Sequence, residues 1–259
     1  MIIYCNGDSF TAGTELGDDI LPGYPGTMDF TSTAEQRASF EKWKRSTHDP
    51  SRLGPTRDAN RFLIEKLEKE RSWPNKLSKL ANTEVVNNAE GGASMDRIAR
   101  TTVCDLLRLK ETSNDITAII GTTSELRFEV GNKLFWQSIL VSSHVTKDIE
   151  PLVRFKVEYE TDYHAFVNYF KNIIYIQDFC RANGFKLYFV SPNYIYPNFK
   201  LLQKNQDLFD MVKYADLKYE LILQEVAEKI NYNALTPTLH HSEAVHEEVA
   251  KILYEKLIK

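Results

Sequence analysis

The sequence of 259 residues has little cysteine, no excess of basic charge and no long hydrophobic run. Cys5, Cys104 and Cys180 lie far apart without a C-x-x-C pair, so we expect free thiols rather than a disulfide framework or a zinc ribbon. The net charge is −4 and the basic residues are scattered, which argues against a nucleic-acid partner. No run approaches the ~18 apolar residues that span a bilayer, and no signal-peptide pattern is evident. These absences predict a cytoplasmic protein with no membrane partner.

Four short apolar runs lack polar alternation, which is typical of buried parallel strands. They cover residues 2–5, 84–87, 117–121 and 186–191, and a weaker fifth strand is predicted near 232–235. Patterns with helical spacing lie between or after them, at residues 61–69, 73–81, 94–109, 162–183 and 243–257. Ser242 is the candidate N-cap of the last one.

Strands that alternate with helices predict a parallel sheet covered on both faces. We therefore expect a single domain over residues 1–259, a three-layer α/β/α sandwich around five strands. Residues 17–60 and 130–161 do not fit the alternation and are predicted to be insertions. Both follow strand ends, so they either overhang a site or only decorate the fold.

The motif NGDSFTAG, residues 6–13, follows the first predicted strand. Asp8 and Ser9 have two interpretations. Both residue types are favoured as helix N-caps, which would make the motif structural. Alternatively, Ser9 is a nucleophile at the carboxyl edge of the sheet, where ligands bind in such folds. A nucleophilic serine needs a base and oxyanion donors elsewhere in the chain.

Candidate donors follow the second and third strands. NNAEGGAS, residues 87–94, contains Gly92 and Ser94, and the alternative for this stretch is a tight turn with Ser94 as a helix cap. IGTTSELR, residues 120–127, contains Thr123, for which turn chemistry is the alternative. Arg127 either closes an anionic substrate pocket or forms an ordinary ion pair.

The candidate base lies in TLHHSEAVH, residues 238–246, just before the last predicted helix. A single histidine is most often structural, but three within seven residues favour function. Their spacing matches no common zinc pattern, and no cysteine is near in sequence, so no metal is expected.

The ordered set GDSFTAG, SWPNKLSKL, GGAS and HHSEAVH resembles the SGNH, or GDSL-type, hydrolases over most of the chain. The overall sequence also resembles members of this family that are encoded by large tailed phages. The resemblance implies a flavodoxin-like fold, Ser9 as nucleophile, and an oxyanion hole formed by the N–H groups of Ser9 and Gly92 with Thr123. It implies His240 as the base, with His241 as the alternative after a shift of one residue. No cofactor is implied. Further candidate substrate contacts are Asp8, Ser94, Arg127 and His241.

Two positions depart from the family pattern. Thr123 stands where the family has an asparagine that donates to the oxyanion, and losing one such donor costs ~10²–10³ in rate. Pro237 stands where the family has the aspartate that orients the histidine, a loss that costs up to ~10⁴ in serine proteases. A dyad is expected unless Glu243 or a distant acid substitutes.

The expected function is that of a serine esterase or acyl hydrolase acting on a small acylated substrate, such as an O-acylated sugar. Acyl transfer is the same chemistry with water excluded. Two other classes stay open: a binding module on the same fold, which the two departures favour, and an FMN-binding protein, which would leave the histidines unused. The oligomeric state and the acyl group are not predicted.

Overall fold

The computed structural model describes residues 1–14, 16–21, 24, 35, 38–39, 42, 55–131, 136–140, 154, 162–193, 195–215, 217, 219–229 and 241–258. Most of the two predicted insertions, the predicted strand at 232–235, and His240 therefore lie outside the described residues.

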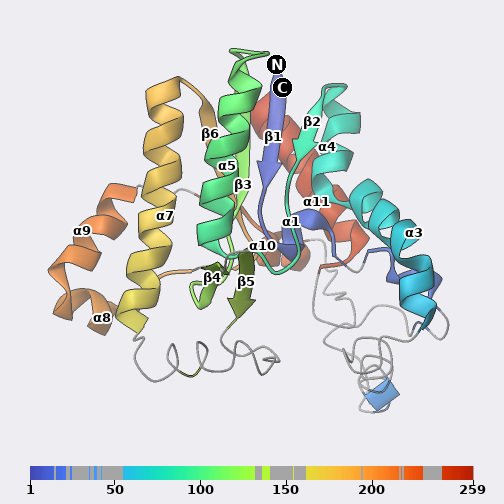
Figure 1. Cartoon of the computed structure of the whole chain (residues 1–259), viewed down its shortest axis with the longest axis horizontal. Coiled ribbons are helices and arrows are strands. Elements are labelled where there is room, and N and C mark those ends of the chain that lie inside the picture. Colours follow the sequence, from blue (N-terminus) through green and yellow to red (C-terminus); the bar gives the residue numbers. More distant parts are fainter. Residues whose placement is uncertain are drawn as a thin grey trace.

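A five-stranded parallel sheet in the order β2-β1-β3-β6-β7 forms the centre of the protein (Figure 1). Ile3 of β1 pairs with Val85 on one side and with Thr117 on the other. A separate antiparallel pair, β4 and β5, extends from the loop that follows β3. The strands are β1 (Ile2–Asn6), β2 (Val85–Asn87), β3 (Ile116–Gly121), β4 (Arg127–Gly131), β5 (Trp136–Leu140), β6 (Lys186–Ser191) and β7 (Tyr219–Ile222).

Helices cover both faces of the sheet (Figure 1). On one face lie α5 (Met95–Lys110), α7 (Asp162–Asn183), α8 (Phe199–Lys204) and α9 (Gln206–Ala215). On the other lie α4 (Trp73–Ala81), α10 (Leu223–Lys229) and α11 (Glu243–Leu253), which continues as a π-helical turn, η2 (Tyr254–Ile258). The remaining elements are α1 (Ser9–Ala12), η1 (Asp18–Ile20) and α3 (Pro55–Arg71).

Strand β1 shows why two separate cores form. Successive side chains of a strand point to opposite faces, so Tyr4 packs beneath α5 and α7 while Ile3 and Cys5 pack beneath α4 and α11. All three side chains are fully buried. The predicted three-layer α/β/α architecture with a five-stranded parallel sheet is confirmed.

The predictions of individual elements hold best where the pattern is long. The helices at 73–81 and 162–183 and the strand at 186–191 have the predicted bounds. The strand beside β6 is β7 at Tyr219–Ile222, which was not predicted, and the strand predicted at 232–235 lies outside the described residues. The four residues of β7 run directly into α10, so they carry no period that separates them from a helix. The β4–β5 pair was not predicted.

No helix in the described part of the chain is long and apolar enough to cross a membrane.

Two glycines at the strand ends leave room for Thr11 of the first helix. A Cβ atom added at Gly121 would lie 1.9 Å from Thr11 Oγ1, and one added at Gly7 would lie 2.3 Å from the same atom. Thr11 is buried between these two strand ends. The position of α1 against β1 and β3 therefore depends on glycine at both places.

We expect Gly121→Ala to destabilise the protein by about 1–3 kcal/mol, the usual cost of overpacking. Thr11→Ala removes the hydroxyl that the new Cβ meets at 1.9 Å, so it should recover part of this loss. Gly184→Ala is the control, because Gly184 has a φ of +72° but nothing within 4 Å of an added Cβ. Chemical denaturation measures all variants. If Thr11→Ala rescues Gly121→Ala no better than it rescues Gly184→Ala, the steric explanation is wrong.

The three cysteines are free, and they differ in access. Cys104 is exposed, whereas Cys5 and Cys180 are buried. Burial raises the pKa of the Cys180 thiol to about 12 and raises that of Cys5 further.

We expect one thiol to react rapidly with a disulfide reagent at pH 8 in the folded protein, and three in guanidinium. The reactive species is the thiolate, which a buried thiol with a raised pKa does not form at this pH. Cys104→Ser should abolish the rapid phase. A rapid phase that survives this substitution would contradict the burial of Cys5 and Cys180.

Candidate functional site

The candidate residues gather where the carboxyl ends of β1, β2 and β3 meet. The helix that leads from β2 to β3 covers one face of the sheet, and α4, which leads into β2, covers the other. Such a reversal leaves a crevice beyond the strand ends, which is where ligands bind in doubly wound sheets. The loops at 7–8, 88–94 and 122–126 border this edge.

Asp8, not Ser9, is the N-cap of α1. Asp8 Oδ1 accepts a hydrogen bond of 3.0 Å from the backbone N–H of Phe10. Ser9 is the first residue of the helix, and Gly13 ends it in the left-handed region with φ +78°. The structural interpretation of the motif is therefore confirmed for Asp8.

The Ser9 hydroxyl is buried and has no hydrogen-bond partner among the described residues. Only 4% of the residue is exposed. Buried hydroxyl groups in folded proteins are nearly always hydrogen-bonded, so an orphan needs an explanation. In the loop after β2, a Cβ added at Gly91 would lie 4.0 Å from Ser9 Cβ and 3.1 Å from Thr14 Oγ1. Sequence reasoning singled out Gly92 and did not identify Gly91.

The other oxygen of Asp8 joins two predicted site residues. Asp8 Oδ2 accepts from Thr123 Oγ1 at 2.8 Å and from Arg127 Nη1 at 2.9 Å. Arg127 Nη1 also donates to Thr123 Oγ1 at 2.9 Å. An ionised carboxylate only accepts and a guanidinium only donates, so the single Thr123 proton points to Asp8. Asp8 and Thr123 are both almost completely buried.

The loop after β2 approaches Ser9 from the side of α5. Glu90 N–H donates to the carbonyl of Gly7 at 3.1 Å, and Gly92 adopts a φ of +81°. Ser94 is buried and its hydroxyl accepts from Arg97 N–H, so the interpretation of Ser94 as a helix cap is confirmed.

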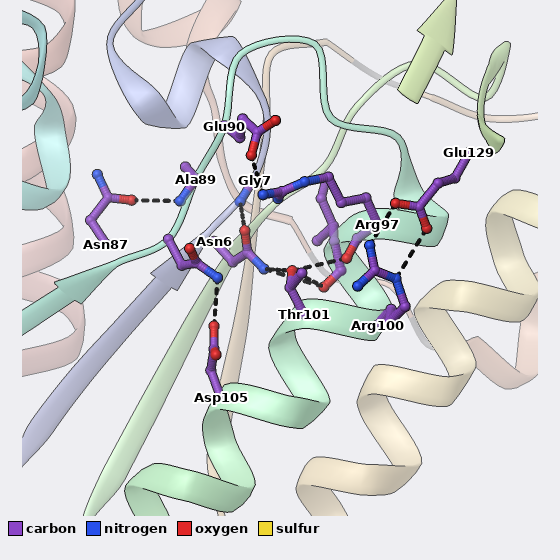
Figure 2. A network of polar contacts seen from close by, with 12 residues as sticks. Asn6, Gly7, Asn87, Ala89, Glu90, Arg97, Arg100, Thr101, Asp105 and Glu129 are labelled. Carbon is purple, nitrogen blue, oxygen red and sulfur yellow. Dashed lines mark hydrogen bonds and ion pairs between the residues drawn. The ribbon is translucent and has the colours of Figure 1, made fainter. Parts of the chain in front are cut away.

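Asn6 fastens the end of β1 to α5 (Figure 2). Its amide nitrogen lies 2.8 Å from Thr101 Oγ1, 3.0 Å from Thr102 Oγ1 and 3.2 Å from the Ile98 carbonyl. Its amide oxygen accepts from Gly7 N–H at 2.8 Å. These contacts fix the point from which the motif NGDSFTAG leaves the sheet.

Of the three clustered histidines, the structure describes two. His241 is buried beside α1, with its ring centroid 5.5 Å from that of Phe10, the neighbour of Ser9. His246 is only 2% exposed and has a different role. Its Nδ1 accepts from Trp73 N–H at 3.1 Å, so it satisfies one of the first N–H groups of α4. Ser242 occupies the N-cap position of α11 as predicted, but its hydroxyl makes no capping hydrogen bond.

We expect His246→Ala to lower the free energy of unfolding by about 2 kcal/mol. The substitution leaves a buried N–H group unsatisfied, which costs ~1–3 kcal/mol. His164→Ala is the control at an exposed position, where changes stay within about 0.5 kcal/mol. Urea denaturation of both variants and the wild type gives the difference. Equal stability of the two variants would contradict the capping role.

Glu243, the acid proposed as a substitute in the triad, faces cations on the protein surface. Its oxygens lie 2.7 Å from Lys76 Nζ and 3.7 Å from Arg71 Nε. The carboxylate is therefore already engaged by α4 and the end of α3. In the described part of the chain, no three His, Cys, Asp or Glu residues form a group that could hold a metal ion.

Neither a protein-family model nor a curated protein sequence matches the chain. Solved structures do. The chain is similar to the psychrotrophic esterase EstA from Pseudoalteromonas sp. (TM-score 0.48, 9% identity, 99% of this chain and 96% of that one). It is also similar to the acetyl xylan esterase AlAXEase (TM-score 0.45, 10% identity, 100% of this chain and 100% of that one). A third similar structure is a member of the lipolytic G-D-S-L family from Veillonella parvula (TM-score 0.43, 11% identity, 100% of this chain and 99% of that one). The structural neighbours of the chain are thus G-D-S-L lipolytic proteins and esterases. A phage origin stays a prediction.

Proposed function

We propose that the protein is a serine esterase or acyl hydrolase in which Ser9 is the nucleophile. The observation that carries this proposal is the buried Ser9 hydroxyl, which makes no hydrogen bond within the described residues although the neighbouring Asp8 is fully bonded. Leaving a buried hydroxyl unsatisfied is costly. Together with the position of Ser9 at the carboxyl edge of the sheet, this cost supports a functional role.

In the proposed reaction, Ser9 Oγ attacks the carbonyl carbon of an ester and His240 accepts the serine proton. The tetrahedral intermediate collapses to an acyl-enzyme when His240 returns this proton to the leaving alcohol. Water, activated by the same histidine, then releases the acid and regenerates Ser9. An alcohol in place of water would give acyl transfer.

The N–H groups of Ser9 and Gly92 are the proposed oxyanion donors. Ser9 N–H is one of the first N–H groups of α1, which have no acceptor within the helix. The proton of Thr123 is directed at Asp8, so we assign Thr123 to supporting this carboxylate rather than to the oxyanion itself. The resulting hole has two donors.

The substrate class follows from the same proposal. A small acylated molecule, such as an O-acylated sugar, is the proposed substrate, and no cofactor takes part. The alternative is a binding protein with a weakened site, which is favoured by the loss of the amide donor at Thr123 and of the acid at Pro237.

A fluorophosphonate probe tests the proposal without knowledge of the substrate, because it reacts only with an activated serine. We expect one adduct by intact mass on the wild type and none on Ser9→Ala. His240→Ala should slow labelling by ~10²–10⁴, the usual contribution of a general base. If His241→Ala has this effect instead, His241 is the base.

Ser242→Ala is the matched control, because Ser242 is also 4% exposed with a hydroxyl that has no partner in the described chain. It should label like the wild type. A folded wild type that takes no adduct would overturn the esterase proposal and favour the binding protein.

A further inference from the structure

The guanidinium of Arg127 contacts the two loops that carry the proposed oxyanion donors and also the loop after β3. Its Nη1 lies 2.9 Å from Asp8 Oδ2 after β1, 2.9 Å from Thr123 Oγ1 after β3, and 3.4 Å from the carbonyl of Ala93 after β2. Ala93 directly follows Gly92, and Asp8 directly precedes Ser9. One nitrogen atom thus links the neighbours of both proposed donors.

We infer that Arg127 is a positioning residue, which locks these three loops so that the N–H groups of Ser9 and Gly92 face the same point. This inference rests on the proposed function for its catalytic consequence, but the lock itself is a property of the fold. It assigns Arg127 to the architecture of the site rather than to an anionic substrate.

The link to Ser9 passes through Asp8. The Asp8 side chain is 1% exposed and carries the cap of α1 on Oδ1, while Oδ2 binds Arg127. A buried carboxylate that loses its cationic partner is strongly destabilised, so it moves toward water or takes up a proton. Either change weakens the cap, and Ser9 is the first residue of the capped helix.

The strand that begins with Arg127 is itself held against α5. Arg127 is the first residue of β4, and two residues later Glu129 binds Arg100 of α5 through both carboxylate oxygens, at 2.7 and 3.2 Å (Figure 2). Glu129 is 5% exposed, so this pair anchors β4 against α5. The neighbouring pair offers a comparison variant, because Arg100 binds Glu129 on the strand that begins with Arg127.

The experiment compares Arg127→Met, Arg127→Lys and Arg100→Met. Methionine keeps the apolar stem without charge, while lysine keeps the charge but not the planar fork that binds several acceptors. The first readout is hydrogen exchange at Thr11, Ala12, Glu90 and Ala93, whose N–H groups bond within or between the first two loops. The second readout is the rate of fluorophosphonate labelling at Ser9.

For Arg127→Met, we expect exchange at least about tenfold faster in both loops, because the free energy of their local opening is lower. Labelling should fall about 10²-fold, which is the effect of a misplacement near 1 Å. Arg127→Lys should lie between Arg127→Met and the wild type. Arg100→Met acts on the loops through Glu129 and β4, so it should speed exchange at the four reporter amides and slow labelling of Ser9 less than Arg127→Met does.

The two proposals fail in different ways. A wild type that takes no adduct, combined with faster exchange in Arg127→Met, would refute the esterase and keep the lock. Unchanged exchange in both loops of Arg127→Met would overturn the lock whatever the labelling shows. Faster exchange confined to β4 would also overturn the lock, because Arg127 would then stabilise its own strand and not the loops.

Discussion

The buried carboxylate of Asp8 is the interaction on which the candidate site depends. A carboxylate excluded from water must be satisfied by donors, and Asp8 obtains them from its own helix, from Thr123 and from Arg127. Oδ1 accepts from the first turn of α1, and Oδ2 binds the residues that follow β3. Asp8 takes the structural role in NGDSFTAG, and the hydroxyl of Ser9 makes no hydrogen bond among the described residues.

The sheet topology determines which residues Asp8 meets. Strand β1 lies between β2 and β3, so the loops after these strands approach one another although they are far apart in sequence. Gly7 and Gly121 then allow α1 to lie directly against the strand ends. The packing of a short helix and the placement of a charged network are thus two results of one arrangement of strands.

The histidines illustrate how one sequence cluster divides into different roles. His246 caps α4 from a buried position, and His241 packs beside Phe10. The proposed mechanism assigns proton transfer to His240 and keeps His241 as the alternative base. A cluster of one residue type in sequence is therefore weak evidence for a single shared site, since neighbouring side chains at the start of a helix point in different directions.

Local pattern alone determined much of the fold, because helices such as Trp73–Ala81 and strands such as Lys186–Ser191 follow from periodicity and capping within a few residues. Strand β7 was not predicted, because its four residues carry too little pattern. The sequence also identified Ser9, Thr123 and Arg127 as candidate site residues. Only the tertiary structure decided their relations: that Asp8 caps while Ser9 does not, and that Arg127 binds three loops at once. Those contacts join residues up to 119 positions apart, so their geometry exists only once the sheet has formed.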